Sequence, residues 1–283
     1  LQADETPVLV NKDGRPAGSK SYMWVYRTGS MVPSKQIILY EYQKTRNTSH
    51  PREFLKGFHG ICVTDGYQVY HTLEKERVDL RIAGCWAHAR RRYDEAVGAL
   101  PKKARKGSKA YEALAMIQAI YREEGCLKGL PPEERLTRRR NSVKPLVEAY
   151  FAWVHEKVGQ VAEKSKTWEG LQYSLNQEKY LKVFLEDGEV PMDNNASEQS
   201  IRSFCIGKKN FVMIDTIHGA RASAMIYSIA ETAKANNLKP YDYFEYLLTE
   251  IPKHMEDTDL SFCEELLPWS PSLPEKCRKP VKD

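Results

Sequence analysis

Three carboxylates stand where predicted secondary-structure elements begin or end. Asp4 heads the first predicted strand, in ADETPVLV, Asp65 closes a later strand, in VTDGY, and Glu198 lies in PMDNNASEQSIRS at 191–203. Carboxylate oxygens are ligands that Mg²⁺ prefers. Two such ions, roughly 3.5 to 4 Å apart, activate an attacking water or 3′-hydroxyl and stabilise the leaving oxygen in phosphodiester displacement. If the three acids converge, they predict a site for this chemistry.

Each acid also has an ordinary structural interpretation. Asp65 with Gly66 is a common turn pair, and Asp4 is compatible with a solvated chain end. Glu198 lies three residues after Asn195, the spacing of a capping box in which both side chains satisfy the first turn of a helix. The residues themselves leave capping and catalysis open for Glu198.

The composition is typical of a soluble, folded protein. Of the 283 residues, 41% are hydrophobic and 29% charged, which excludes a membrane protein and a disordered chain. No apolar run approaches the roughly 20 residues of a membrane span, and no secretory signal opens the sequence. The six cysteines show no CxxC spacing, so we expect no disulfide and a reducing, cytoplasmic location.

Positive charge is clustered along the chain. The formal net charge is only +5, but lysine and arginine gather in PKKARKGSK at 101–109, TRRRNS at 137–142, HARRRY at 88–93 and IGKKN at 206–210. Such clusters indicate either phosphate contacts or solvated helix faces.

The first 85 residues predict an α/β sheet. Three strands, ETPVLV, KSYMWVYRT and QIILYEYQK, are followed by a helix PREFLKGF, a strand GICVTDG, a helix near 68–77 and a strand LRIAGCW. This β-β-β-α-β-α-β order predicts a ribonuclease H-like fold, a mixed five-stranded sheet with flanking helices in which the first and fourth strands are neighbours. Asp4 and Asp65 would then approach one edge.

The rest of the chain predicts mainly helices. Stretches such as KAYEALAMIQAIYREEG carry helical apolar spacing, and no strand is evident between 86 and 190. Beyond about 252 the sequence predicts an irregular strap or a partly disordered tail. We therefore expect four parts: a first part of the core at 1–86, a large helical insertion at 87–190, a core completion carrying the Glu198 helix at 191–251, and a tail at 252–283.

Several motifs, in order, resemble one family. ADETPV, YMWVY, FLKGFHGICVTDGYQVY, AGCWAHARRRYDEA, DNNASEQSIR, GKKNF and HGARASAMIYSIAETAKANNLKPYDYFEYLL are similar to the DDE transposases of bacterial insertion sequences, in particular the insertion sequence 66 family. The resemblance implies that Asp4, Asp65 and Glu198 are metal-binding catalytic acids holding two Mg²⁺ or Mn²⁺ ions. It also implies that the helical stretch is an insertion before the helix of the glutamate.

The implied activity is metal-dependent hydrolysis of DNA at insertion-sequence ends and transfer of the freed strands to target DNA. The implied partner is DNA, bound by a homo-oligomer that pairs two ends, with no membrane. Two alternatives stay open: a catalytically inactive DNA-binding relic, and a related nuclease without strand transfer.

The sequence departs from the family at three places. Gln199 stands where members usually have arginine after the glutamate, and Lys208 replaces the arginine of a GRKN motif. By the same resemblance, members of the family are longer proteins with a DNA-recognition region upstream of the first acid, whereas the sequence here begins three residues before Asp4. We therefore expect it to be the catalytic part of a longer protein or a fragmentary element.

Candidate DNA contacts follow from position. The predicted phosphate contacts are Arg202, Lys208, Lys209 and Arg221 around Glu198, His88 and Arg90 after the fifth strand, and the basic insertion residues Lys102, Lys103, Arg105, Lys106, Arg138, Arg139 and Arg140.

Three further residues have competing interpretations. Trp86 suits a stacking platform for a displaced base or, preferably, a buried anchor. Cys85 with His88 lacks the second ligand pair of a structural zinc site, so packing is preferred for Cys85. Asp193 is interpreted as a helix-terminus or arginine partner.

Overall fold

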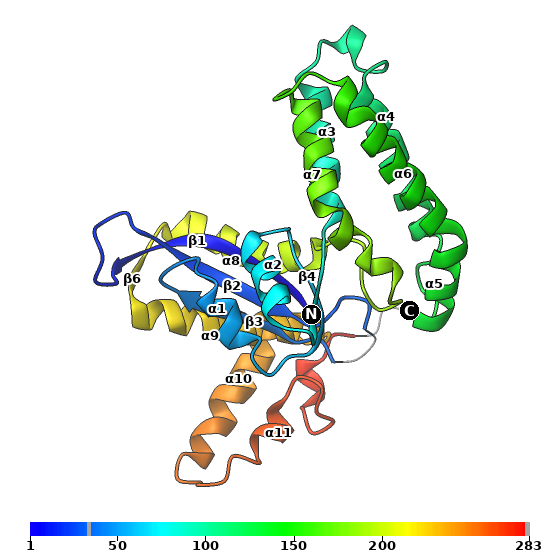
Figure 1. Cartoon of the computed structure of the whole chain (residues 1–283). Helices are drawn as coiled ribbons and strands as arrows, with labels where there is room; N and C mark the ends of the chain where they lie inside the picture. The colour runs from blue at the N-terminus through cyan, green and yellow to red at the C-terminus, as the bar shows by residue number, and fades with distance from the viewer. Residues whose placement is uncertain (33–34, 281–283) are drawn as a thin grey trace. The chain divides into compact units, whose positions relative to one another are not determined.

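The computed structural model describes residues 1–32 and 35–280 and shows a mixed α/β protein (Figure 1). The strands are β1 (Gln2–Lys12), β2 (Lys20–Arg27), β3 (Ile38–Gln43), β4 (Gly60–Val63), β5 (Leu80–Ala83) and β6 (Ile214–Thr216). The helices are α1 (Ser49–Phe54), α2 (Gln68–Glu76), α3 (Trp86–Gly98), α4 (Lys109–Gly125), α5 (Pro132–Arg138), α6 (Lys144–Lys157), α7 (Lys166–Leu181), α8 (Asn195–Phe211), α9 (Ile217–Ala235), α10 (Pro240–Glu250) and α11 (Cys263–Leu266).

The six-stranded sheet has the order β3-β2-β1-β4-β5, and β6 pairs with β1. β2 and β3 are antiparallel, whereas β4 runs parallel to β1, with Gln2 opposite Val63, and parallel to β5. The predicted element order and the neighbouring first and fourth strands are confirmed. The predicted count of five strands is wrong, because β6 adds a sixth whose three residues are too few to show an alternating pattern.

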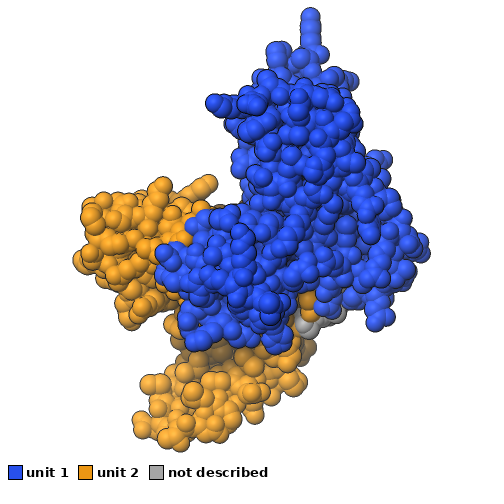
Figure 2. All heavy atoms as spheres, in the orientation of Figure 1, with its two compact units in different colours: residues 1–3, 47–195 blue, residues 4–46, 196–283 orange. Residues whose placement is uncertain are grey.

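The chain divides into two compact units (Figure 2). Unit 1 comprises residues 1–3 and 47–195, and unit 2 comprises residues 4–46 and 196–283. Strand β1 contributes its first residues to unit 1 and the remainder to unit 2.

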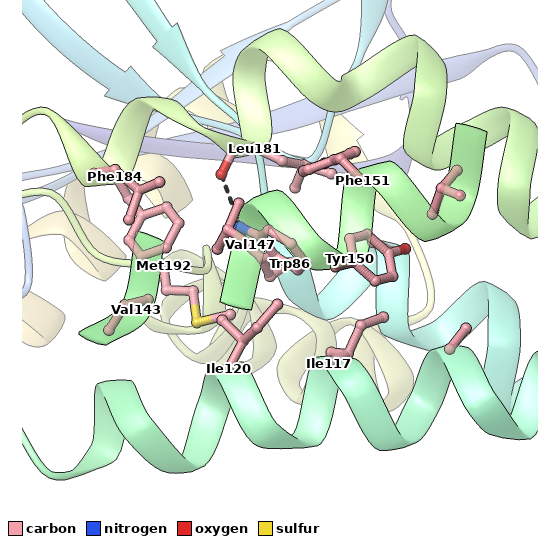
Figure 3. Close-up of a cluster of buried hydrophobic side chains, with 14 of the residues drawn as sticks. Trp86, Ile117, Ile120, Val143, Val147, Tyr150, Phe151, Leu181, Phe184 and Met192 are labelled. Carbon is pink, nitrogen blue, oxygen red and sulfur yellow. Dashed lines mark hydrogen bonds between the residues drawn. The ribbon is translucent and has the colours of Figure 1, made fainter. Parts of the chain in front are cut away.

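Helices α3, α4, α6 and α7 of unit 1 pack around a shared apolar core (Figure 3). Trp86 at its centre is 0% exposed, donates from Nε1 to the carbonyl of Leu181 at 2.8 Å and packs on Tyr150, Phe151 and Phe184. The preferred interpretation of Trp86 as an anchor is confirmed, and a base-stacking role is wrong. The stretch 86–190 is helical without strands, as predicted.

One arginine of the predicted basic surface is buried. Arg139 is 0% exposed and donates from Nη1 to the carbonyls of Phe184, Asp187 and Val190 at 2.7, 2.7 and 2.9 Å. Its Nε donates to Oε2 of Glu124 at 3.0 Å. The prediction of a DNA-contacting Arg139 is therefore wrong, because Arg139 lies on the same buried helix face as Arg135 and Val143.

In unit 2, α8 and α9 pack on the strands through a separate core that contains Val8, Val10, Tyr40 and Phe204. α9 is also hydrogen-bonded to β3, since Oγ1 of Thr232 donates to the carbonyl of Ile38 at 2.9 Å. These contacts fix α8, the helix that carries Glu198, against the sheet.

The tail forms an ordered strap within its described residues. Leu266, Leu273 and Cys277 are buried against α10, and the hydroxyl of Tyr243 donates to the carbonyl of Leu266 at 2.7 Å. Residues 252–280 contain the short helix α11 and the 3₁₀ turn Glu275–Cys277, and residues 281–283 lie outside the described range.

No disulfide joins any of the six cysteines, all of which lie in the described residues. No described helix is long and apolar enough to cross a membrane.

Candidate functional site

Two neighbouring acids on β1 have different surroundings. Asp4 is half-buried, and its Oδ1 accepts the N–H of Glu5 at 2.8 Å. The side chain of Glu5 is 1% exposed, and its Oε1 accepts from Nε of Arg46 at 2.6 Å. Successive side chains of a strand point to opposite faces. The buried carboxylate of Glu5 is thus paired with a half-buried arginine, whereas Asp4 lies on the other face of the strand.

Glu198 lies in the first turn of α8. The side chain is half-buried, and its Oε1 is shielded from solvent. The helix begins at Asn195 itself, so Asn195 is the first helical residue and not the N-cap that the expected capping box requires. The Asn195 N–H donates to Oδ1 of Asp193 at 3.1 Å, which confirms Asp193 as a helix-terminus partner.

Side chains from the sheet hold the first turns of α8. Nη1 of Arg27, at the end of β2, donates to the carbonyl of Ala196 at 3.1 Å and to Oγ of Ser200 at 3.3 Å. The hydroxyl of Tyr40 on β3 donates to the carbonyl of Ser200 at 2.6 Å. Burial raises the pKa of Tyr40 far above its usual value, so the phenol stays protonated and remains a donor.

Arg27 and Tyr40 bind α8 at two positions, one on each side of Glu198 along the helix. Ala196 and Ser200 lie two residues before and after Glu198. Sequence reasoning missed Arg27 and Tyr40. A charged residue after the apolar run YMWVY marked Arg27, but no local pattern indicated its partners on α8.

Asp65 belongs to unit 1 and follows β4 by two residues. Its Oδ1 accepts the N–H of Tyr67 at 2.9 Å, and its carbonyl accepts the hydroxyl of Tyr173 at 3.2 Å. Gly66 has φ +90°, a left-handed conformation that favours glycine. The turn interpretation of Asp65 and Gly66 is therefore confirmed, and such a turn fixes the direction in which the aspartate leaves the sheet.

Basic side chains of unit 2 gather around α8 and the start of α9. Arg202, Lys209 and Arg221 are exposed, and Nζ of Lys208 donates to the carbonyl of Pro7 at 2.8 Å. A pocket of about 370 Å³ has basic and apolar walls, formed by Lys20, Lys208, Lys209, Pro7, Val8, Leu9 and Val212. Three lysines around one pocket provide a patch that suits phosphate groups.

Two predicted contacts lie on α3 of unit 1. Arg90 is exposed and lies 3.7 Å from the carboxylate of Asp94. His88 is half-buried, with Nε2 3.3 Å from Nη1 of Arg91. Cys85 is buried and its Sγ accepts the N–H of Asn194 at 3.2 Å, in agreement with a packing role.

The loop between α3 and α4, residues 101–108, is the most basic exposed stretch of unit 1, and we name it the basic loop. Lys102, Lys103 and Lys106 are exposed, whereas Arg105 donates from Nε to the carbonyl of Leu100 at 3.0 Å and secures the end of α3. Arg138 and Arg140 are also exposed.

The model of the Transposase IS66 family matches residues 1–222, and that of the IS66 C-terminal element matches residues 228–269. The chain belongs to the IS66 transposase family. All three candidate acids lie inside the first match, and α10 together with the beginning of the strap lies inside the second. The resemblance drawn from the sequence motifs is therefore confirmed.

Curated relatives of this IS66 family member are longer. The chain is 28% identical over 278 residues to the uncharacterized protein y4qI of Sinorhizobium fredii (strain NBRC 101917 / NGR234), and 27% identical over 285 residues to y4hP of the same strain. Each alignment covers 95% of this chain and 50% of the relative, so the chain spans about half their length. No solved structure shows a significant match.

Proposed function

We propose that this chain carries the catalytic part of a transposase that cleaves DNA phosphodiesters at insertion-sequence ends and joins the freed 3′-hydroxyls to target DNA. The observation that carries the proposal is the IS66 family match over residues 1–222, within which carboxylates lie on β1, in the turn after β4 and in the first turn of α8. The catalytic acids of the proposal are Asp4, Asp65 and Glu198.

The strand arrangement supports a ribonuclease H-like core. Two antiparallel strands precede the parallel pair β4 and β5 in the order β3-β2-β1-β4-β5. The pair Gln2 and Val63 lies two residues before Asp4 on one strand and two residues before Asp65 on the other. Each of the two aspartates therefore lies two residues beyond the last paired position of β1 and β4, and the proposal takes residues 87–190 as a helical insertion into the core.

The donor set fits divalent metal ions. All three proposed ligands are carboxylates, the hard oxygen donors that Mg²⁺ and Mn²⁺ bind. Two bound ions would supply activation of the attacking hydroxyl and stabilisation of the leaving oxygen. The residues of the chain contribute orientation: the Asx-type turn at Asp65 and the bonds from Arg27 and Tyr40 to α8 restrict where the carboxylates point.

The basic residues support a DNA substrate. Arg202, Lys208, Lys209 and Arg221 are proposed to contact phosphates near the acids, together with His88 and Arg90, and the basic loop to contact a further part of the duplex. Two ends must be processed together in transposition, so we propose a homo-oligomer on paired DNA ends and a cytoplasmic site of action.

The test replaces each acid by its amide in the full-length protein, using Asp4→Asn, Asp65→Asn and Glu198→Gln. We expect each change to lower cleavage of a duplex carrying the insertion-sequence end, in Mn²⁺, by about 100-fold or more, because charge stabilisation in the transition state is lost. Duplex binding should stay at or slightly above the wild-type level, since a negative charge near the phosphates is removed.

The matched control is Glu53→Gln, whose side chain is 80% exposed in α1. It should cleave like the wild type. Full activity of Asp65→Asn or Glu198→Gln would reject the assignment, and cleavage without joining by the wild type would indicate a nuclease instead.

A further inference from the structure

Asn194 is a buried amide bonded on both sides. Its Nδ2 donates to the carbonyl of Ala3 at 2.7 Å, and its Oδ1 accepts from Nε2 of Gln2 at 3.3 Å. Asn194, Gln2 and Ala3 are each 0% exposed. All three belong to unit 1, although 191 positions separate Asn194 from Ala3. A desolvated amide is stable in such a place only when its donors and acceptors are satisfied.

The bond to Ala3 replaces a bond of the sheet. Val63 donates its N–H to the carbonyl of Leu1 at 2.9 Å, and in a continuing parallel ladder the carbonyl of Ala3 would accept the N–H of residue 65. However, β4 ends at Val63 and the chain turns at Asp65. The amide of Asn194 satisfies the Ala3 carbonyl at the point where the two strands part.

The bond also joins the segments that lead to two proposed catalytic acids. Ala3 is the residue immediately before Asp4, and Asn194 lies four residues before Glu198. We propose that Asn194 is a positioning residue, which fixes the strand leading into Asp4 against the segment that opens α8, so that both acids are held for metal binding. This inference rests on the proposed function of the site.

The two residues before Asn194 are also held by hydrogen bonds within unit 1. The Trp86 N–H donates to the carbonyl of Met192 at 3.2 Å, and the hydroxyl of Tyr121 lies 3.4 Å from Oδ2 of Asp193. Burial raises the pKa of Tyr121 far above its usual value, so this phenol stays a donor. The side chain of the next residue, Asn195, is exposed, which makes Asn195 a matched control on the same segment.

The test compares Asn194→Ala with Asn195→Ala in the full-length protein. Mn²⁺ affinity is measured by electron paramagnetic resonance titration without DNA, and thermal unfolding is recorded in parallel. We expect Asn194→Ala to weaken Mn²⁺ binding about tenfold or more, as loss of a residue that orients metal ligands does. Asn195→Ala should bind Mn²⁺ like the wild type.

Two outcomes would overturn the inference. If Asn194→Ala lowers Tm but keeps wild-type Mn²⁺ affinity, the bond to Ala3 is structural only. If Asn194→Ala does not fold, Gln2→Met is tested instead, because it keeps the side-chain volume but removes the donor to Oδ1 of Asn194. We expect Gln2→Met to bind Mn²⁺ several-fold more weakly than the wild type. Wild-type Mn²⁺ affinity of Gln2→Met would reject the positioning role of Asn194.

Glu198→Gln separates this inference from the function on which it rests. Weaker Mn²⁺ binding by Glu198→Gln with unchanged binding by Asn194→Ala rejects only the role of Asn194. Unchanged binding by Glu198→Gln rejects the metal site itself, and the inference falls with it.

Discussion

Arg27 reaches the carbonyl of Ala196 from the end of β2, with Nη1 3.1 Å from the oxygen. The same nitrogen also donates to Oγ of Ser200, and Nη2 donates to Oε1 of Gln36 at 2.9 Å. The guanidinium is thus fixed by side chains while it holds the helix backbone around Glu198. The rotation of α8 about its axis is set by bonds from the sheet as well as by apolar packing.

Replacing this arginine should separate activity from folding. Arg27→Met keeps an unbranched side chain but removes the charged hydrogen bonds, each worth about 1.5–3 kcal/mol. We expect the free energy of unfolding to fall by about 2 kcal/mol and DNA cleavage to fall about tenfold or more, because small displacements of catalytic groups are costly. Urea unfolding and the cleavage assay measure the two effects.

Arg52→Met is the control for Arg27→Met. Arg52 is partly exposed and pairs with Glu76 at 2.8 Å on unit 1, so its loss should change stability by less than about 1 kcal/mol. Wild-type cleavage by a destabilised Arg27→Met would show that the orientation of Glu198 does not depend on Arg27.

The adjacent arginines 138 and 139 should differ sharply in their effect on stability. Arg139→Met leaves three backbone carbonyls and the carboxylate of Glu124 without the guanidinium. Breaking a buried pair costs about 3–5 kcal/mol, whereas Arg138→Met at an exposed position should cost less than about 0.5 kcal/mol. Urea unfolding of the two variants checks this, and equal stabilities would contradict it.

The ion pair between Asp13 and Arg15 predicts a pH dependence. Nε of Arg15 donates to Oδ2 of Asp13 at 3.0 Å, and this bond is the main reason that the pKa of Asp13 is lowered from 3.8 to about 2. Because the folded pKa is the lower one, the stabilisation is present above the unfolded pKa and is lost as pH falls through the folded pKa.

The Tm difference between the wild type and Asp13→Asn should therefore be constant above about pH 5 and shrink as the pH falls from about 4 to about 2. Thermal unfolding across this range measures it. A difference that does not change down to pH 2 would mean that the carboxylate charge of Asp13 does not stabilise the fold.

Local patterns in the sequence predicted most of the fold. Alternation and turn residues gave the first five strands, and helical apolar spacing gave the helices of 86–190, because both patterns record which face is buried. β6 was missed because a three-residue strand has too few positions for a period. The burial of Arg139 is not visible in the local density of positive charge, which predicted an exposed cluster. It is visible in the spacing, because Arg135, Arg139 and Val143 are four residues apart, share one helix face and are all buried.

The candidate site was predictable only in part. Family motifs and element ends pointed to Asp4, Asp65 and Glu198, and the capping spacing correctly indicated a helix start near Asn195. The partners that restrain these segments come from distant positions: 169 residues separate Arg27 from Ala196. No local pattern encodes such pairings, so Arg27 and Asn194 required the three-dimensional structure.

The basic loop gives a last prediction, about DNA affinity. Lys102, Lys103 and Lys106 are exposed between α3 and α4, and the 3₁₀ turn Lys102–Ala104 that holds two of them has no buried residue. Changing all three to glutamine should leave Tm unchanged and weaken duplex binding. The plot of log affinity against log salt concentration has a negative slope, and each phosphate contact contributes about 0.9 to its steepness. The slope of the triple variant should therefore be shallower than that of the wild type by roughly 2 to 3.

The control changes two exposed lysines of the C-terminal region, Lys253→Gln and Lys276→Gln, which pair with Glu250 and Glu245. Fluorescence anisotropy with one duplex, at several salt concentrations, compares the variants. A loop that contacts phosphates changes the slope as well as the affinity, because bound counterions are released at each contact. If the loop variant keeps the wild-type slope while the control pair lowers it, the DNA path runs along the C-terminal region and the loop is a solvated surface.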